Sequence, residues 1–163
     1  METLFLTFTC YGQHQHGHPD GSWNRDSTSH APHKGLERYE QKLMSEPAYA
    51  LDPASRALVL AAIEETALRL GWNLIAVHVR TTHVHLVVEA ERTPDRVLAT
   101  CKAYATRALR HAGQNRERFW VRRLRTRVAL DDVVRYVLDG QGEQMVCFCS
   151  IRSALMWPDR SDG

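Results

Sequence analysis

The chain has 163 residues, of which 44% are hydrophobic and 25% are charged, and this composition is typical of a single globular domain. The formal net charge of +2 at pH 7 does not by itself indicate a nucleic-acid partner. No apolar run approaches membrane-spanning length and no basic region opens the chain, so we expect neither a membrane span nor a signal peptide. The four cysteines form no C-x-x-C pair, which favours a reducing cytoplasm.

The first part of the chain predicts one strand and one helix, separated by a long polar segment. Thr3–Tyr11 is rich in Phe, Leu and Thr, as strands are. From about 12 to 50 the chain is polar and rich in Gly, Pro and His, which predicts a polar surface insertion with little regular structure. Asp52 is a suitable N-cap, Pro53 suits the first helical position and Gly71 suits the helix end, so a helix is predicted between them.

The remaining sequence predicts an alternation of strands and helices without an internal repeat. The predicted elements are strands Trp72–Arg80 and His83–Ala90 joined as a tight hairpin, helix Pro94–His111, strand Arg118–Val128, helix Leu130–Asp139 and strand Met145–Ser150. The order β-α-β-β-α, followed by β-α-β, predicts an α+β fold. We expect an antiparallel sheet with helices packed on one face and the other face open.

One predicted strand carries two histidines on the same face. Successive side chains of a strand alternate between faces, so His83 and His85 emerge side by side while Val84 and Leu86 point toward a core. Of the three H-x-H triplets in the chain, only this one lies in a convincing strand. Two imidazoles on a rigid strand are suitable metal ligands. Two half-exposed strand histidines without a ligand are the competing interpretation.

The helix Leu130–Asp139 displays a tyrosine away from its apolar side. Its apolar residues recur at helical spacing and form one stripe: Leu130, Val133, Val134, Val137 and Leu138. Tyr136 falls far from that stripe, whereas Tyr104 lies within the stripe of its own helix and is interpreted as structural. A phenol is a weak nucleophile at neutral pH, but it can attack a phosphoryl group that a metal polarises. Tyr136 and the histidine pair therefore form a coherent set for phosphodiester transesterification.

A basic segment follows the second predicted helix. Six arginines lie between 116 and 127, and Arg123, Arg125 and Arg127 share one strand face by the period of two. Charge on an edge strand protects against aggregation, so a solvated edge is one interpretation. Arginine also suits bidentate phosphate contacts, and neighbouring aromatics suit base stacking. We favour contact with nucleic acid for this strand, with Arg122 included, beside the aromatic pair 119–120.

Five segments together carry a resemblance to a known family. They are the end of the first strand Thr9–Gly12, the H-V-H strand His83–Val88, the basic helix segment Lys102–Arg107, the tyrosine helix Val134–Leu138 and the tail Asp139–Glu143. These segments resemble those of the HUH-type single-tyrosine transposases and their REP-associated transposase-like relatives. The tail is similar to that of a bacterial branch with a long N-terminal insertion. The resemblance covers most of the chain, and an H-V-H strand followed by a tyrosine helix is a fairly specific combination.

The resemblance implies a single ferredoxin-like HUH domain, residues 1–163, that cleaves and rejoins single-stranded DNA. In that family the two histidines, here His83 and His85, hold Mg²⁺ or Mn²⁺ with a third ligand. The tyrosine, here Tyr136, forms a 5′-phosphotyrosine. Lys102 and Arg107 would contact DNA. The implied location is the bacterial cytoplasm, in association with the nucleoid and not with a membrane. Hairpin-forming DNA is one option for the substrate, and monomer and homodimer are both open.

The third metal ligand is where this chain departs from the family. The family commonly has Gln or Asn one turn after the tyrosine, but that position here is Gly140. Gln141 follows directly, and a glycine-permitted turn could bring it toward the metal. Gln141 is therefore the predicted third ligand, with Asp139 and Glu143 as alternatives.

Two other functions compete with DNA cleavage and joining. The first is a domesticated DNA-binding protein on the same fold with weak or no cleavage. The second is a small zinc-binding module, although no paired C-x-x-C supports it. Its candidate ligands are Cys10, His14, His16 and His18.

Overall fold

The structure is a computed structural model that describes residues 2–13, 22–23, 29–30, 33–127, 130–140 and 142–150, with the backbone alone at 22–23, 29–30, 122–127 and 130–132. Its elements in chain order are β1 (Glu2–Cys10), β2 (Ser22–Trp23), β3 (Ser29–His30), α1 (Lys34–Leu43), α2 (Pro53–Leu70), β4 (Asn73–Val79), β5 (His83–Ala90), α3 (Pro94–His111), β6 (Trp120–Arg127), α4 (Leu130–Leu138) and β7 (Val146–Cys149). None of the helices in these ranges is long and apolar enough to cross a bilayer.

Five strands form one sheet in the order β6-β1-β5-β4-β7, and every neighbouring pair is antiparallel. The chain order β1-α2-β4-β5-α3-β6 is the βαββαβ arrangement of ferredoxin-like folds. Strand β7 extends this sheet at the free side of β4. The predicted α+β class and antiparallel sheet are therefore confirmed, and β6 and β7 are the two edge strands.

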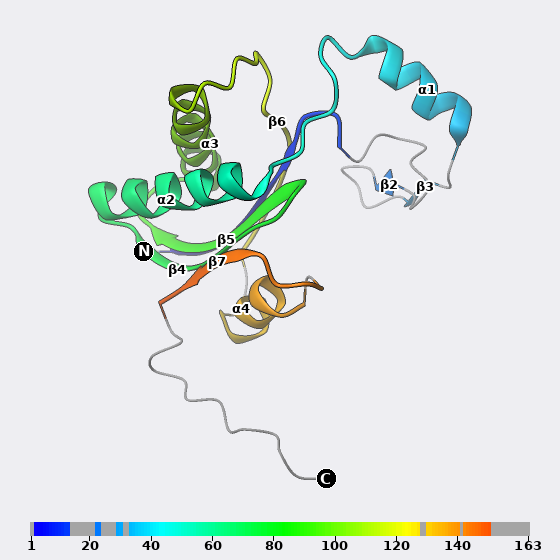
Figure 1. Cartoon of the computed structure of the whole chain (residues 1–163). Coiled ribbons are helices and arrows are strands. Elements are labelled where there is room, and N and C mark those ends of the chain that lie inside the picture. Colours follow the sequence, from blue (N-terminus) through cyan, green and yellow to red (C-terminus); the bar gives the residue numbers. More distant parts are fainter. Residues whose placement is uncertain are drawn as a thin grey trace.

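The helices α2 and α3 cover one face of the sheet, on the upper side of Figure 1. Local signals fix both ends of α2, because the Asp52 side chain accepts a hydrogen bond from the Ser55 N–H at 2.7 Å and Gly71 adopts a left-handed φ of 68°. Val84 and Leu86 of β5 are fully buried in the core under these helices. The faces of β5 are thus assigned as its sequence alternation predicted.

The opposite face of the sheet is not fully open, because α4 packs against it on the lower side of Figure 1. Val137 and Leu138 of α4 are buried there in a second apolar cluster. The sheet contributes apolar residues from three strands to that cluster: Phe5, Ile75, Ala76 and Val87. The stripe of α4 needs an apolar partner, and these residues provide one beside the histidines. This placement differs from the expectation that the face opposite the helices stays open.

The polar insertion contains more regular structure than its sequence predicted. It holds the helix α1 and the short pair β2 and β3, and α1 extends away from the sheet in Figure 1. The helix begins after His33, whose Nδ1 accepts a hydrogen bond from the Leu36 N–H at 3.0 Å. No residue of α1 is buried. Periodicity alone did not reveal this helix because it packs no stripe into the core and its cap is not one of the usual N-cap residues.

Candidate functional site

The two histidines of β5 lie together on the face of the sheet that carries α4. The ring centroids of His83 and His85 are 4.6 Å apart, at an interplanar angle of 76°. His85 is buried, with 6% of its surface exposed, and His83 is half-buried. Their positions match the predicted strand alternation, which places both rings on one face of β5.

Two threonine hydroxyls orient these rings. Thr7 Oγ1 is 2.7 Å from His85 Nδ1, and Thr7 is the register partner of His85 across β1 and β5. Thr82 Oγ1 is 3.0 Å from His83 Nδ1. Where the hydroxyl oxygen accepts a hydrogen bond from Nδ1–H, the lone pair of the neutral ring is on Nε2. The sequence did not reveal either threonine, since the Thr7 contact depends on strand register.

Tyr136 approaches this pair from α4. Its ring centroid is 5.8 Å from that of His85 and 6.1 Å from that of Phe5, both in edge-on geometry. The side chain nevertheless remains 47% exposed, as its position off the apolar stripe predicted. The phenol is therefore held by ring contacts on one side and open to solvent on the other. The structure thus brings Tyr136 to a histidine pair that lies about fifty residues earlier in the sequence.

Gly140 lies directly against the tyrosine. A Cβ atom built on Gly140 would lie 3.0 Å from the backbone oxygen of Tyr136 and 3.1 Å from its ring atom Cδ2. The need for glycine here is close approach, because Gly140 is not among the positive-φ glycines. Gly140 thus leaves room for the Tyr136 ring.

Of the three candidates for a third ligand, two lie within the described residues. Gln141 lies outside them. Asp139 and Glu143 are exposed, and the described part of the chain contains no group of three or more His, Cys, Asp and Glu residues arranged to hold a metal. The two imidazoles suit a divalent transition metal, but they need added oxygen ligands to hold Mg²⁺.

A third histidine, His78, lies beside the site on β4. It has no exposed surface, and it is the register partner of His85. Its Nδ1 is 2.8 Å from the carbonyl oxygen of Val137, and its Nε2 accepts a hydrogen bond from the Met145 N–H at 3.1 Å. Burial lowers the pKa of His78, in keeping with a neutral ring. His78 was not predicted as a site residue, although a histidine within an apolar strand indicates a buried ring with hydrogen-bond partners.

The predicted basic residues lie elsewhere. The four arginines at 122, 123, 125 and 127 are on β6, an edge strand, and the last three are the register partners of Phe8, Leu6 and Leu4. Lys102 and Arg107 lie on α3 and line a groove of about 690 Å³. The groove is also lined by further basic and aromatic residues: Arg110, His111, Arg118, Phe119 and Trp120.

This groove, which we call the α3 groove, is separate from the histidines and the tyrosine. It lies on the side of the sheet that α3 covers, whereas Tyr136 lies on the side that α4 covers. Trp120 is fixed in it by a hydrogen bond from Nε1 to Thr106 Oγ1 at 3.0 Å. Tyr104 is half-buried between Arg69 and Arg107, whose guanidinium carbons lie 4.2 Å and 4.7 Å from its ring centroid. That packing supports the structural interpretation of Tyr104.

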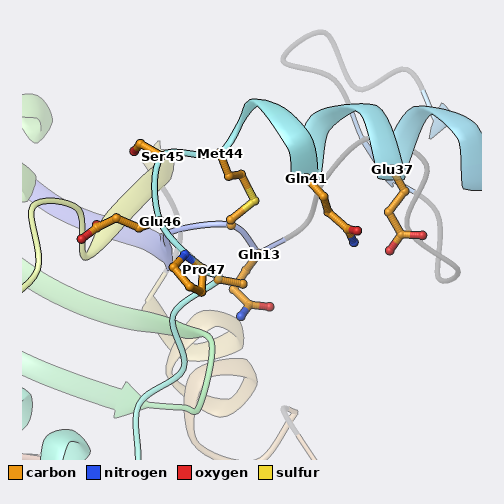
Figure 2. Close-up of a pocket in the computed structure, with 9 residues that line it drawn as sticks. Gln13, Glu37, Gln41, Met44, Ser45, Glu46 and Pro47 are labelled. Atoms are coloured by element: carbon orange, nitrogen blue, oxygen red, sulfur yellow. The ribbon is translucent and has the colours of Figure 1, made fainter.

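A second cavity, of about 580 Å³, lies at the base of α1 (Figure 2). Its polar lining comes from Gln13, Glu37 and Gln41, and Glu46 lies at its edge. The Glu46 carboxylate accepts hydrogen bonds from the backbone N–H groups of Glu117 and Arg118, which lower its pKa. The carboxylate therefore anchors the insertion to the α3–β6 connection.

The zinc-module interpretation finds no support in the described residues. Cys10 is fully buried, and burial raises the pKa of its thiol to about 12. A metal-binding cysteine must be a thiolate, which this environment disfavours. The proposed partners His14, His16 and His18 lie outside the described residues.

Comparisons with known proteins give matches to solved structures alone. No family model and no curated protein matches the chain. A solved structure of a REP-associated tyrosine transposase bound to a REP hairpin aligns with a TM-score of 0.46 and 14% sequence identity. The alignment covers 84% of this chain and 64% of that chain.

Proposed function

We propose that this chain is a DNA-cleaving and DNA-joining enzyme in which Tyr136 is the nucleophile and His83 and His85 bind a divalent cation. The observation that supports this most is the approach of Tyr136 to His85, with ring centroids 5.8 Å apart. Tyr136 lies on α4, which is separated from β5 along the chain by α3 and β6. The tyrosine is half-exposed, so a DNA phosphate can reach it.

The proposed chemistry needs no nucleotide cofactor. The Tyr136 Oη atom attacks phosphorus, the bond to the 3′-oxygen breaks, and the phenolic proton ends on that oxygen. The products are a 5′-phosphotyrosine and a free 3′-hydroxyl. A 3′-hydroxyl of another strand then attacks the phosphotyrosine, which reseals DNA and returns the proton to Tyr136. The covalent intermediate keeps the phosphodiester energy for the joining step.

The proposed metal ligands are Nε2 of His83, Nε2 of His85 and the amide oxygen of Gln141. When bound, Mg²⁺ or Mn²⁺ supplies charge that polarises the scissile phosphate. Thr7 and Thr82 hydrogen-bond the two rings through Nδ1. Such bonds orient a neutral imidazole for metal binding through Nε2. Because imidazole suits Mn²⁺ better than Mg²⁺, we expect Mn²⁺ to support activity at least as well.

The proposed substrate is single-stranded DNA beside a hairpin. The α3 groove combines four basic side chains, Lys102, Arg107, Arg110 and Arg118, with the indole of Trp120. Basic residues contact phosphates and aromatic rings stack on bases. The arginines of β6 would add phosphate contacts at the adjacent edge. We propose that these two regions bind DNA and that the histidines and Tyr136 cut it.

The test is incubation of the purified chain with hairpin-flanked single-stranded DNA and Mg²⁺ or Mn²⁺. We expect a denaturation-resistant adduct with a free 3′-hydroxyl on the released strand. Tyr136→Phe should lose the adduct and keep the fold and DNA binding, while the control Tyr104→Phe should keep all three. An adduct that persists in Tyr136→Phe contradicts the assignment. DNA binding with no adduct in the unmodified chain would instead favour a DNA-binding protein on the same fold.

A further inference from the structure

His78 connects three parts of the molecule that must stay in register. The residue belongs to β4, Nδ1 reaches Val137 of α4, and Nε2 reaches Met145 before β7. None of its surface is exposed. An internal ring with both nitrogens hydrogen-bonded is held in one orientation, and the partners are held in turn.

Only one state of the ring satisfies both contacts. The Met145 N–H must donate, so Nε2 carries the lone pair. The Val137 carbonyl must accept, so Nδ1 carries the proton. Leucine can satisfy neither contact, and asparagine is too short to replace both ring nitrogens. Glutamine offers one donor and one acceptor at the end of its side chain, which is the same pair of functions.

The Val137 contact lies where α4 has the least support of its own. Val137 is in the last turn of this nine-residue helix, where carbonyl groups lack partners within the helix. The carbonyl sits in a buried cluster, so leaving it unsatisfied is costly. The Val137 carbonyl accepts its hydrogen bond from Nδ1 of His78. His78 lies on β4 as the register partner of His85 on β5. Tyr136 directly precedes Val137.

We propose that His78 is a positioning residue that seats the last turn of α4, and with it Tyr136, against His85. It acts through the main chain of Val137 and contacts no reacting atom. This inference rests on the proposed function only for the statement that Tyr136 reacts with DNA. The seating of the helix is a separate statement that can be measured without DNA.

The DNA-free experiment uses the full chain and three variants. Ring-nitrogen NMR should show His78 protonated at Nδ1 and bare at Nε2. In hydrogen exchange, His78→Leu should speed exchange of the α4 amides by about tenfold, the effect of removing one buried hydrogen bond. His78→Gln should restore protection. Val59→Ala, a core change in α2 on the other side of the sheet, should lower overall stability without a selective effect on α4.

The DNA experiment then measures the rate of adduct formation in the same proteins. His78→Leu should slow the rate by about 100-fold at unchanged DNA affinity, because a misplacement of about 1 Å costs roughly that much. His78→Gln should recover most of the rate, and Val59→Ala should keep it. If His78→Leu fails to fold, the comparison of His78→Gln with His78→Asn decides, since only the Gln side chain is long enough to make both hydrogen bonds.

Each outcome separates the two ideas. Selective loss of α4 protection and of adduct in His78→Leu, with rescue by Gln, supports the positioning role. The opposite tautomer, unchanged α4 exchange, or a full adduct rate in His78→Leu overturns it. A wild-type chain that forms no adduct on any DNA overturns the proposed function alone, because the NMR and exchange results do not involve DNA.

Discussion

Replacing Gly140 by alanine tests how closely the tyrosine depends on its helix end. The added Cβ would lie 3.0 Å from the Tyr136 carbonyl oxygen, 3.1 Å from its Cα and 3.1 Å from ring atom Cδ2. Ordinary contacts of this kind begin near 3.4 Å, so something must move by a few tenths of an ångström. The two backbone atoms belong to the hydrogen-bonded helix, whereas the ring can turn. We therefore expect the ring to move away from His85.

The expected effect on chemistry is larger than the effect on stability. Because a shift of about 1 Å can cost about 100-fold, a shift of a few tenths predicts a loss of roughly three- to tenfold in adduct rate. Stability changes in two directions, since Gly→Ala stabilises by about 0.4–1 kcal/mol at a compatible site and crowding opposes this gain. We expect the two to offset each other nearly, so the melting temperature should stay close to that of the wild type.

The assay is single-turnover adduct formation at saturating DNA and Mn²⁺, beside a thermal melt. Gly35→Ala, in the exposed helix α1 and far from the tyrosine, is the matched control and should leave the adduct rate unchanged. A Gly140→Ala chain that reacts at the wild-type rate would refute the argument that this glycine positions the ring. A chain that loses both rate and melting temperature would point to a disrupted helix instead.

Four further outcomes follow from the same geometry. Thr7→Val should weaken Mn²⁺ binding by about 10- to 100-fold, because it removes the hydroxyl that orients His85, and Thr3→Val on the same strand should leave Mn²⁺ titrations unchanged. His83→Ala and His85→Ala should abolish cleavage, and Gln141→Ala should require more metal for the same cleavage rate. If Gln141→Ala titrates like the wild type while Asp139→Asn or Glu143→Gln does not, the third ligand is reassigned. Cleavage in EDTA would exclude the metal role. Joint replacement of Arg123, Arg125 and Arg127 should reduce the slope of log affinity against log salt by about one unit for each phosphate that is no longer neutralised, and an unchanged slope would leave β6 as a charged edge. Because the pKa of Glu46 is lowered in the folded chain, its contribution to stability is present above the ordinary pKa of 4.5 and is lost as pH falls through the lower folded pKa. Glu46→Gln should therefore flatten the acid side of a profile of melting temperature against pH. An unaltered profile would contradict this.

Local signals account for the elements that the sequence predicted well. The cap at Asp52, the glycine at 71 and the alternation along β5 each act within a few residues, so they are readable without tertiary contacts. The tyrosine was found in the same way, because the stripe of α4 leaves Tyr136 outside it. Periodicity states which side of a helix is apolar, but not which surface it will cover. That is why the packing of α4 on the histidine face was not predicted.

Long-range register accounts for what the sequence did not reveal. Thr7 meets His85 only because β1 and β5 pair in one particular register, and a slip of one residue would turn Thr7 to the other face. His78 is the register partner of His85 because the tight turn at Thr81–Thr82 sets the pairing of β4 with β5. The contacts of its ring with Val137 and Met145 depend instead on how α4 and the segment before β7 pack, which no local pattern encodes. The sequence therefore predicted the histidine pair and Tyr136, but not the residues that hold them in place, Thr7 and His78.

The separation of the α3 groove from Tyr136 constrains how one DNA strand could use both. The groove and the tyrosine lie on opposite sides of the sheet, so a strand cannot pass directly between them through the core. Trp120, at the groove, begins β6, and β6 is the sheet edge next to β1. The short route from the groove to the histidines therefore runs around this edge, past the arginines of β6. On that route the arginines would hold the strand between its binding region and its cutting site, and their replacement should weaken cleavage as well as affinity.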